Sequence, residues 1–525
     1  MNIITVDFES FYAADFSLSK ITTEEYIRDD RFEIIGCGVA VNNEPAVWLT
    51  GGHDEVIKQL RTYDWENSFV LAHNTMFDGA ILSWICDIHP KGYLDTLCMA
   101  RAIHGVDASA SLKAVATRYG VGEKGTEVED AKGKRYKDFT PAKLAKYGEY
   151  CVNDVELCRY IFQLMAPKFP KKELKVIDAT IRMFTEPKLE LNLDLLEGHL
   201  ISVRNKKEKL LAAAGVDREF LMSNDKFAEL LRQLNVEPPM KTSPKTGKQA
   251  YAFAKTDEEF KALAEHDDLR VQTLVGARLG NKSTLEETRT QRFIDISNRG
   301  KLPIPLKYYG ARTGRWAASD KINMQNLPRG SMLKQAIEAP EGYMLVGADL
   351  SNIELRVGLW LAGQMDKLKL LGDGLDLYKD FAATVFNVAY DAVDKDQRFI
   401  GKTAQLSLIY GTGADKLRGA IKTMAGRDIG DDLAKEVVET YRRTYSGVKS
   451  IWGVGGKCLE AIHANQSTSI GYKDFAVVDE QGVKLPSGLY LQYPDLKKVT
   501  VNDKPQWDYA IRGGRDRIYG AKVFQ

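Results

Sequence analysis

The chain has 525 residues, with 73 Lys and Arg against 72 Asp and Glu, so its formal net charge is +1. Hydrophobic residues at 44% and charged residues at 28% are ordinary globular values, which exclude a disordered or collagen-like chain. No apolar run reaches the roughly 18 residues that a membrane span needs. We therefore expect a cytoplasmic protein of several domains, without membrane contact.

The N-terminus and the cysteines agree with this expectation. Asp7 and Glu9 stand where a signal peptide would carry basic residues before an apolar core. The six cysteines include no Cys-x-x-Cys pair, which favours reduced thiols over a disulfide or zinc framework.

The first 165 residues predict an α/β domain. Strand-like runs cover residues 3–8, 33–41, 46–50 and 68–72, and polar turns separate them. Helical periodicity then replaces this pattern from residue 95 to about residue 165, and two prolines follow.

The middle of the chain, residues 173–299, is mostly helical and charged. One loop, residues 238–248, carries Lys241 and Lys245 among Pro, Gly, Ser and Thr. Lysines in such a loop can contact nucleic-acid phosphates, although a solvated loop is the commoner explanation.

A set of acidic residues recurs through the predicted α/β domain. Asp7 and Glu9 are two apart in a strand and therefore point to one face of the sheet. Two carboxylates on one face repel each other unless a cation or proton lies between them, but a lone Asp-x-Glu is more often a solvated strand face. Asp78 follows the strand at 68–72, and Tyr150 and Asp154 are spaced i, i+4 on a helix.

In this order, the four acids and the tyrosine resemble proofreading exonuclease domains of the DEDDy type. The resemblance covers about residues 1–165 and implies an RNase H-like domain over residues 1–168. It implies that Asp7, Glu9, Asp78 and Asp154 hold two divalent metals and that Tyr150 orients the attacking water. Carboxylate oxygens suit Mg²⁺ or Mn²⁺, and two such ions can stabilise the entering and the leaving oxygen.

A second acidic motif lies further along. Residues 343–349 read as an apolar strand that ends at Asp349, and an amphipathic helix over 350–362 follows. A local explanation exists for each acid. Ser351-x-x-Glu354 matches a capping box, and Asp349 could be an ordinary acid at a strand end.

The next motif is a helix with one distinctive face. Arg398, Lys402, Leu406 and Tyr410 follow one another at four-residue intervals, so they line a face about 18 Å long at 1.5 Å per residue. Two cations and an aromatic ring in that order suit a nucleoside triphosphate, with its phosphates at Arg398 and Lys402 and its base near Tyr410. The alternative is a solvated helix with a buried Leu/Tyr edge.

Together these motifs resemble A-family DNA polymerases of the bacteriophage type, and the resemblance runs over nearly the whole chain. Segments 310–315 (Gly-Ala-Arg-Thr-Gly-Arg) and 323–328 (Asn-Met-Gln-Asn-Leu-Pro) resemble those that grip primer and template. Segments 441–448 and 485–488 extend the match. The DNA-binding residues that we expect, besides Lys241 and Lys245, are Arg312, Arg315, Gln325 and Asn326.

The resemblance also implies a fold and a set of ligands. Asp349 would bind the catalytic metals, two Mg²⁺ or Mn²⁺ per active site, and Glu354 would help to exclude the ribose 2′-hydroxyl. Primer-template DNA and dNTPs would be the partners. The fold would be an α+β right hand with an incomplete palm, divided into thumb and connecting helices (169–300), first part of the palm (301–363), fingers (364–440) and the remaining fingers and palm (441–525).

This sequence departs from the family in three places, one of which is Tyr378, where many members have His. Leu406 stands where Phe or Tyr is usual, so discrimination against dideoxynucleotides does not carry over. The third polymerase motif, a His-Asp-Glu with a second metal-binding aspartate, is missing from the sequence, and Asp479 in Val-Val-Asp-Glu comes too early to replace it. We therefore expect the larger part of a split or truncated enzyme, with a second polypeptide carrying His-Asp-Glu.

Three hypotheses follow from the sequence. The first is a DNA polymerase with a 3′→5′ exonuclease, completed by another polypeptide. The second is a 3′→5′ exonuclease whose C-terminal region binds DNA but does not polymerise. The third is a non-enzymatic primer-template clamp, against which the intact acid set argues.

Overall fold

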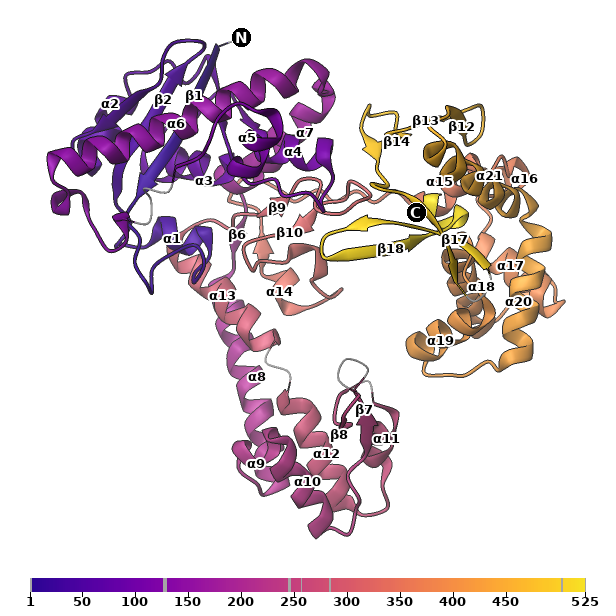
Figure 1. Ribbon diagram of the computed structural model, residues 1–525. Helices are drawn as coiled ribbons and strands as arrows, with labels where there is room; N and C mark the ends of the chain where they lie inside the picture. The colour runs from indigo at the N-terminus through magenta and orange to yellow at the C-terminus, as the bar shows by residue number, and fades with distance from the viewer. Residues whose placement is uncertain are drawn as a thin grey trace.

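The computed structural model describes residues 2–125, 130–243, 247–255, 257–282, 285–501 and 504–524. It has three parts (Figure 1): an N-terminal α/β body, a helical arm that projects from it, and a mostly helical C-terminal region with two small sheets. The mixed α/β class agrees with the expectation from the sequence. Among the described helices, none is both long and apolar enough to cross a bilayer.

The N-terminal body is built on a five-stranded sheet with strand order β3-β2-β1-β4-β5. The central strand β1 pairs antiparallel with β2 and parallel with β4. The four predicted strands are confirmed to within two residues at each end, whereas the short β5 was missed. The strands are β1 (Asn2–Ser10), β2 (Ile34–Val41), β3 (Val47–Thr50), β4 (Ser68–Ala72) and β5 (Gly92–Asp95).

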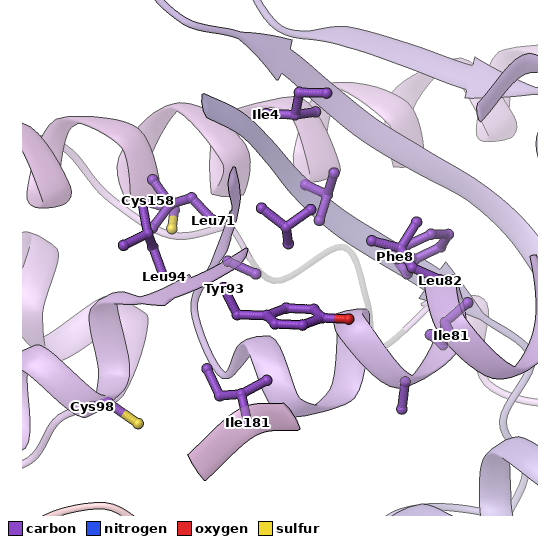
Figure 2. Close-up of a cluster of buried hydrophobic side chains, with 14 of the residues drawn as sticks. Ile4, Phe8, Leu71, Ile81, Leu82, Tyr93, Leu94, Cys98, Cys158 and Ile181 are labelled. Atoms are coloured by element: carbon purple, nitrogen blue, oxygen red, sulfur yellow. The ribbon is translucent and has the colours of Figure 1, made fainter. Parts of the chain in front are cut away.

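Helices cover this sheet and bury one large apolar core (Figure 2). Ile4 and Phe8 of β1 and Tyr93 of β5 belong to this core, and so does Ile181 of α7. The core therefore continues past residue 168, where we expected the first domain to end. The helices of this body are α1 (Thr23–Arg28), α2 (His53–Leu60), α3 (Thr75–Ala80), α4 (Thr96–His104), α5 (Leu112–Tyr119), α6 (Pro141–Met165) and α7 (Lys171–Thr185).

The helical arm is the region expected to be the thumb. Helix α8 leads away from the body, α12 and α13 return, and a separate apolar cluster fills the tip. At its base, Arg299 of α13 donates to the buried Glu24 of α1 at 2.7 Å. The elements are α8 (Leu193–Ala214), α9 (Arg218–Met222), α10 (Asn224–Gln233), β7 (Met240–Thr242), β8 (Gln249–Tyr251), α11 (Glu258–Ala262), α12 (Leu269–Lys282) and α13 (Leu285–Arg299).

The C-terminal region places a cluster of helices beside two antiparallel sheets, β12-β13-β14-β15 and β16-β17-β18. Its helices are α15 (Ile353–Leu361), α16 (Met365–Gly372), α17 (Leu377–Phe386), α18 (Lys395–Leu408), α19 (Ala414–Ala425), α20 (Asp431–Thr444) and α21 (Ser446–His463). Its sheet strands are β12 (Thr468–Ile470), β13 (Ala476–Asp479), β14 (Gly482–Lys484), β15 (Tyr490–Leu491), β16 (Lys497–Val501), β17 (Lys504–Ile511) and β18 (Gly514–Ile518). Helix α14 (Met332–Gln335) lies apart from the helix cluster and packs against α8 at the base of the arm.

Short two-stranded pairs join these larger parts. Strand β6 (Glu190–Leu191) pairs with β11 (Ile337–Glu338), and β9 (Leu306–Lys307) pairs with β10 (Ala317–Ala318). Each pairing is antiparallel.

The predicted strand over residues 343–349 does not form. These residues are exposed and have no strand assignment, and Met344 and Val346 leave 82% and 78% of their surface accessible. A strand needs a neighbour to accept its backbone hydrogen bonds, and none of the described strands lies alongside these residues. We call residues 343–350 the exposed apolar segment.

Candidate functional site

The first candidate site begins on β1, the central strand of the N-terminal sheet. Ile4, Val6 and Phe8 point into the apolar core, so the alternation of the strand turns Asp7 and Glu9 to the opposite face. Helix α6 covers that face. Gly38 on β2 permits its close approach, because a Cβ there would lie 2.8 Å from Val155 Cγ2.

The two remaining predicted acids join Asp7 and Glu9 from separate helices. Asp78 of α3 accepts a hydrogen bond from the backbone N–H of Phe8, which lies between the two β1 acids, at 3.1 Å. Asp154 of α6 is 2% exposed. The structure thus brings together four carboxylates that are up to 147 residues apart in sequence.

Burial and mutual repulsion govern the charge of this site. Burial, reinforced by Asp154, raises the pKa of Asp7 to about 7. Burial, with Asp7 as a neighbour, raises the pKa values of Glu9 and Asp78 well above the usual range. Carboxylates gathered out of water repel one another, so a bound cation would stabilise their ionised forms at this site.

The donor set fits a divalent cation. Asp7, Glu9 and Cys151 each place a ligand atom within 4.8 Å of the other two. The Cys151 thiol donates to the Asp7 carbonyl at 3.1 Å, and burial raises its pKa well above the usual range. The carboxylates are therefore the ligands that we assign, and hard oxygen donors suit Mg²⁺ or Mn²⁺.

A tyrosine that we did not predict completes the α6 face. The Tyr147 hydroxyl donates to Glu9 Oε2, while the predicted Tyr150 stacks on Tyr147 with ring centroids 6.2 Å apart. Tyr147, Cys151 and Asp154 are spaced i, i+4, i+7 along one face of α6. That spacing was a usable signal in the sequence.

A lysine was also missed. The Lys124 ammonium pairs with Asp154 Oδ2 and lies 5.0 Å from the centroid of the Tyr150 ring. Asp7 and Lys124 line a cleft of about 670 Å³, which also includes Asn74 and Arg101. No periodicity could have revealed this residue, because it lies outside the regular elements.

The second candidate site gathers three predicted residues from three segments. Arg315 Nη2 donates to Glu354 Oε1 at 2.8 Å, and the Tyr410 hydroxyl donates to Glu354 Oε2 at 3.1 Å. The three side chains line a pocket of about 260 Å³ whose other walls are apolar, including Val357 and Ile409.

This geometry corrects the capping-box hypothesis for Glu354. Helix α15 has Asn352 as its N-cap, in a left-handed conformation and without a side-chain cap hydrogen bond. Glu354 instead binds Arg315 and Tyr410, because both groups reach it across the pocket.

Helix α18 carries the predicted cationic face. Arg398, Lys402 and Leu406 are exposed on it, whereas Tyr410 lies two residues beyond its end. Arg398 pairs with Asp376 at 2.6 Å. The close packing of α18 on α17 accounts for the glycine at position 401, because a Cβ there would lie 2.2 Å from the carbonyl oxygen of Tyr378 on α17.

Asp349, the predicted palm aspartate, lies exposed at the end of the exposed apolar segment. The described contacts do not place a second carboxylate of the chain against it. Asp479 accepts a hydrogen bond from the Tyr490 hydroxyl at 2.8 Å within its own small sheet.

The predicted DNA-binding residues have different surroundings. Gln325 and Asn326 are exposed. Arg312 is engaged within the protein, pairing with Asp107 at 2.7 Å and with Asp516 at 3.3 Å. Lys241 pairs with Asp257 at 2.7 Å near the tip of the arm. Lys245 lies outside the described residues.

The sequence comparison establishes the family. The family model described as DNA polymerase family A matches residues 197–465, just over half of the chain. The chain belongs to DNA polymerase family A. The motifs that we assigned to palm and fingers, from Arg312 to Tyr410, lie inside the matched range.

Known relatives agree with this membership. A DNA polymerase of Bacillus phage SP02 is 24% identical over 100% of this chain and 88% of its own length. DNA polymerase I of Pseudomonas aeruginosa is 27% identical over 67% of this chain, and the match spans only 39% of that enzyme. The thermostable DNA polymerase I of Thermus thermophilus is 31% identical over 29% of this chain and 18% of its own length.

A solved structure shows the same fold. The polymerase domain of Pol1 from M. smegmatis, in complex with DNA primer-template and dNTP, superposes with a TM-score of 0.61. The match covers 89% of this chain and 76% of that chain at 17% sequence identity.

Proposed function

We propose that this chain is a DNA-directed DNA polymerase with a 3′→5′ proofreading exonuclease. The observation that carries the polymerase activity is the Arg315–Glu354–Tyr410 cluster beside the cationic face of α18, within a chain of family A. Primer-template DNA and dNTPs are the proposed substrates, as in the M. smegmatis complex.

The proposed roles follow from position and charge. Arg398 and Lys402 bind the triphosphate, and Tyr410 and Leu406 face its base and sugar. Glu354 excludes a ribose 2′-hydroxyl. Exposed Gln325 and Asn326 contact the primer-template, with Arg315 near the primer end. We keep Arg312, Lys241 and Lys245 as proposed DNA contacts, the first two requiring release from their acidic partners.

The proposed exonuclease uses the buried acid set. Asp7, Glu9, Asp78 and Asp154 hold divalent cations, and Tyr150 orients water. Bound cations supply Lewis-acid stabilisation of the entering and leaving oxygens. What supports this role is that four acids from three elements gather around β1, and that one of them, Asp7, lines a cleft large enough for a nucleotide.

We also propose that a second polypeptide completes the polymerase site. In the exposed apolar segment, apolar side chains at both odd and even positions are exposed to solvent. A contiguous apolar surface of this kind is unfavourable for a monomer. Asp349 belongs to this segment, so a strand added alongside it would bring its own side chains next to that carboxylate. We commit to a partner strand that carries an aspartate, in the His-Asp-Glu form that the family resemblance implies.

Primer extension tests both parts of this proposal. The purified chain, with nuclease activity removed by Asp154→Ala, should extend a primer very weakly alone and well with a His-Asp-Glu polypeptide. An Asp→Asn change in that polypeptide should abolish the gain. Robust extension without a partner would contradict the need for a second polypeptide.

Substitutions on the chain locate the docking surface. Val346→Lys should prevent the partner from restoring extension, because it places a charge where a strand would pack. Met424→Lys on α19, which is also exposed, serves as the matched control and should leave restoration intact.

A second candidate function is a 3′→5′ exonuclease whose C-terminal region binds DNA without polymerising. The exposed position of Asp349 favours this alternative. Nuclease activity on a mispaired 3′ end, together with an absence of extension under every partner condition, would support it over the polymerase.

A further inference from the structure

Lys124 is a cation inside a site made otherwise of acids. Its ammonium contacts Asp154, whose side chain is 2% exposed, whereas the Lys124 side chain is 29% exposed. The lysine therefore reaches the acids from the cleft, and Asp154 lies at the buried end of the pair.

The charge of Lys124 acts on more than one acid. It lowers the pKa values of Asp7 and Glu9, opposing the effect of burial on both groups. One ammonium cannot balance four neighbouring carboxylates, so the site retains its demand for positive charge. A divalent cation meets that demand better than a single ammonium does.

The chemistry of lysine permits its displacement. Its charge sits on a flexible four-carbon stem, and the ammonium is strongly hydrated and makes no fixed bidentate contact. Released from Asp154, it would remain in the cleft formed by Asp7, Asn74 and Arg101, where a DNA strand would have to lie.

We propose that Lys124 is a displaceable counter-cation of the acid site: it occupies Asp154 until a divalent cation binds, and then binds a phosphate of the DNA strand. This inference rests on the proposed exonuclease function. It adds a residue that couples metal loading to substrate binding.

Metal binding without DNA tests the first half. Titration of the full chain with Mn²⁺, followed by electron paramagnetic resonance, should show about three- to tenfold tighter binding for Lys124→Met, because the competing ammonium is gone. Lys124→Arg, which keeps a cation, should stay near the unsubstituted chain. Equal or weaker Mn²⁺ binding by Lys124→Met would overturn the proposal.

Lys113→Met is the matched control. Lys113 is exposed and lines the same cleft, and its substitution removes the same charge. Mn²⁺ affinity should therefore change little in this variant. An equal tightening in both variants would show a general charge effect and overturn the specific role of Lys124.

Steady-state kinetics at saturating Mn²⁺ test the second half. Lys124→Met should raise the KM for a single-stranded oligonucleotide about tenfold, with a much smaller change in kcat, and an unchanged KM would overturn the phosphate contact. A different result would show that the exonuclease proposal itself is wrong. In that case the double variant Asp7→Ala with Glu9→Ala would bind Mn²⁺ as tightly as the unsubstituted chain does.

Discussion

The two candidate sites of this chain differ in how completely the fold builds them. The acid site of the N-terminal body draws on β1, α3 and α6. Its Glu9, Asp78 and Asp154 are buried, and Glu9 and Asp78 accept hydrogen bonds from within the body. The second site places Glu354 and Lys402 in solvent and leaves Asp349 on the exposed apolar segment. The first site is organised within the fold, whereas the charged groups of the second site are open to solvent.

This difference has an electrostatic counterpart. In the N-terminal site, burial raises the pKa values of Asp7 and Asp78, so a bound cation would stabilise their ionised forms. In the second site, the Arg315–Glu354 pair has side chains 63% and 48% exposed, where water screens the interaction. The acid site is therefore built into the fold, whereas the charged groups of the second site lie largely in solvent.

The largest expected effect tests the completeness of the first site. Asp7→Ala with Glu9→Ala should lower 3′→5′ degradation of a single-stranded oligonucleotide by about a thousandfold or more, because the lost metal ligands cost several kcal/mol. Asp349→Ala is the control and should degrade normally. Undiminished degradation by the double variant would contradict the assignment of Asp7 and Glu9 as metal ligands of an exonuclease.

The second prediction concerns the exposed cationic face of α18. Lys402→Ala should weaken dNTP binding by roughly 10- to 150-fold, the equivalent of about 1.5–3 kcal/mol for a contact with a charged group. Binding of a nucleoside monophosphate, which cannot reach both cations, should change far less. Fluorescence titration measures both, and an equal loss for the two nucleotides would indicate a structural role for the helix.

The third prediction concerns the packing behind that face. Gly401→Ala should lower stability by about 1–3 kcal/mol, because the new methyl group would press on the Tyr378 carbonyl. Gly419→Ala on α19 meets no atom within 4 Å and should instead gain roughly 0.5–1 kcal/mol. Thermal unfolding of the two variants would show opposite shifts. A neutral Gly401→Ala would mean that α17 and α18 can separate easily.

The smallest expected effect separates the two tyrosines of α6. Tyr147→Phe removes the hydroxyl that holds Glu9, so Mn²⁺ affinity should fall about fivefold. Tyr150→Phe should leave metal affinity unchanged and lower kcat. The same response in both variants would show that the stacked pair acts as a unit.

Much of the first domain could be predicted because its signals are local. Alternating apolar residues predict β1, and the same alternation places Asp7 and Glu9 on one face. The i, i+4 spacing of Tyr150 and Asp154 similarly places both on one face of α6. The exposed face of α18 followed from the same reasoning, although the helix ends before Tyr410.

Other features depend on contacts that no local pattern encodes. Lys124 reaches Asp154 from a segment without regular structure. Arg312 pairs with Asp107 and Asp516, which lie about 200 residues away in opposite directions. Gly401 makes sense only beside Tyr378.

The sequence by itself therefore predicted which residues would carry the chemistry, and it determined which of them share a face, because periodicity acts within one element. The tertiary structure alone decided which elements meet. It brought four distant acids to one buried face, and it paired Glu354 with Arg315 and Tyr410 in place of a helix cap. It also left residues 343–349 without a strand neighbour, because an apolar sequence becomes a strand only where another backbone accepts its hydrogen bonds.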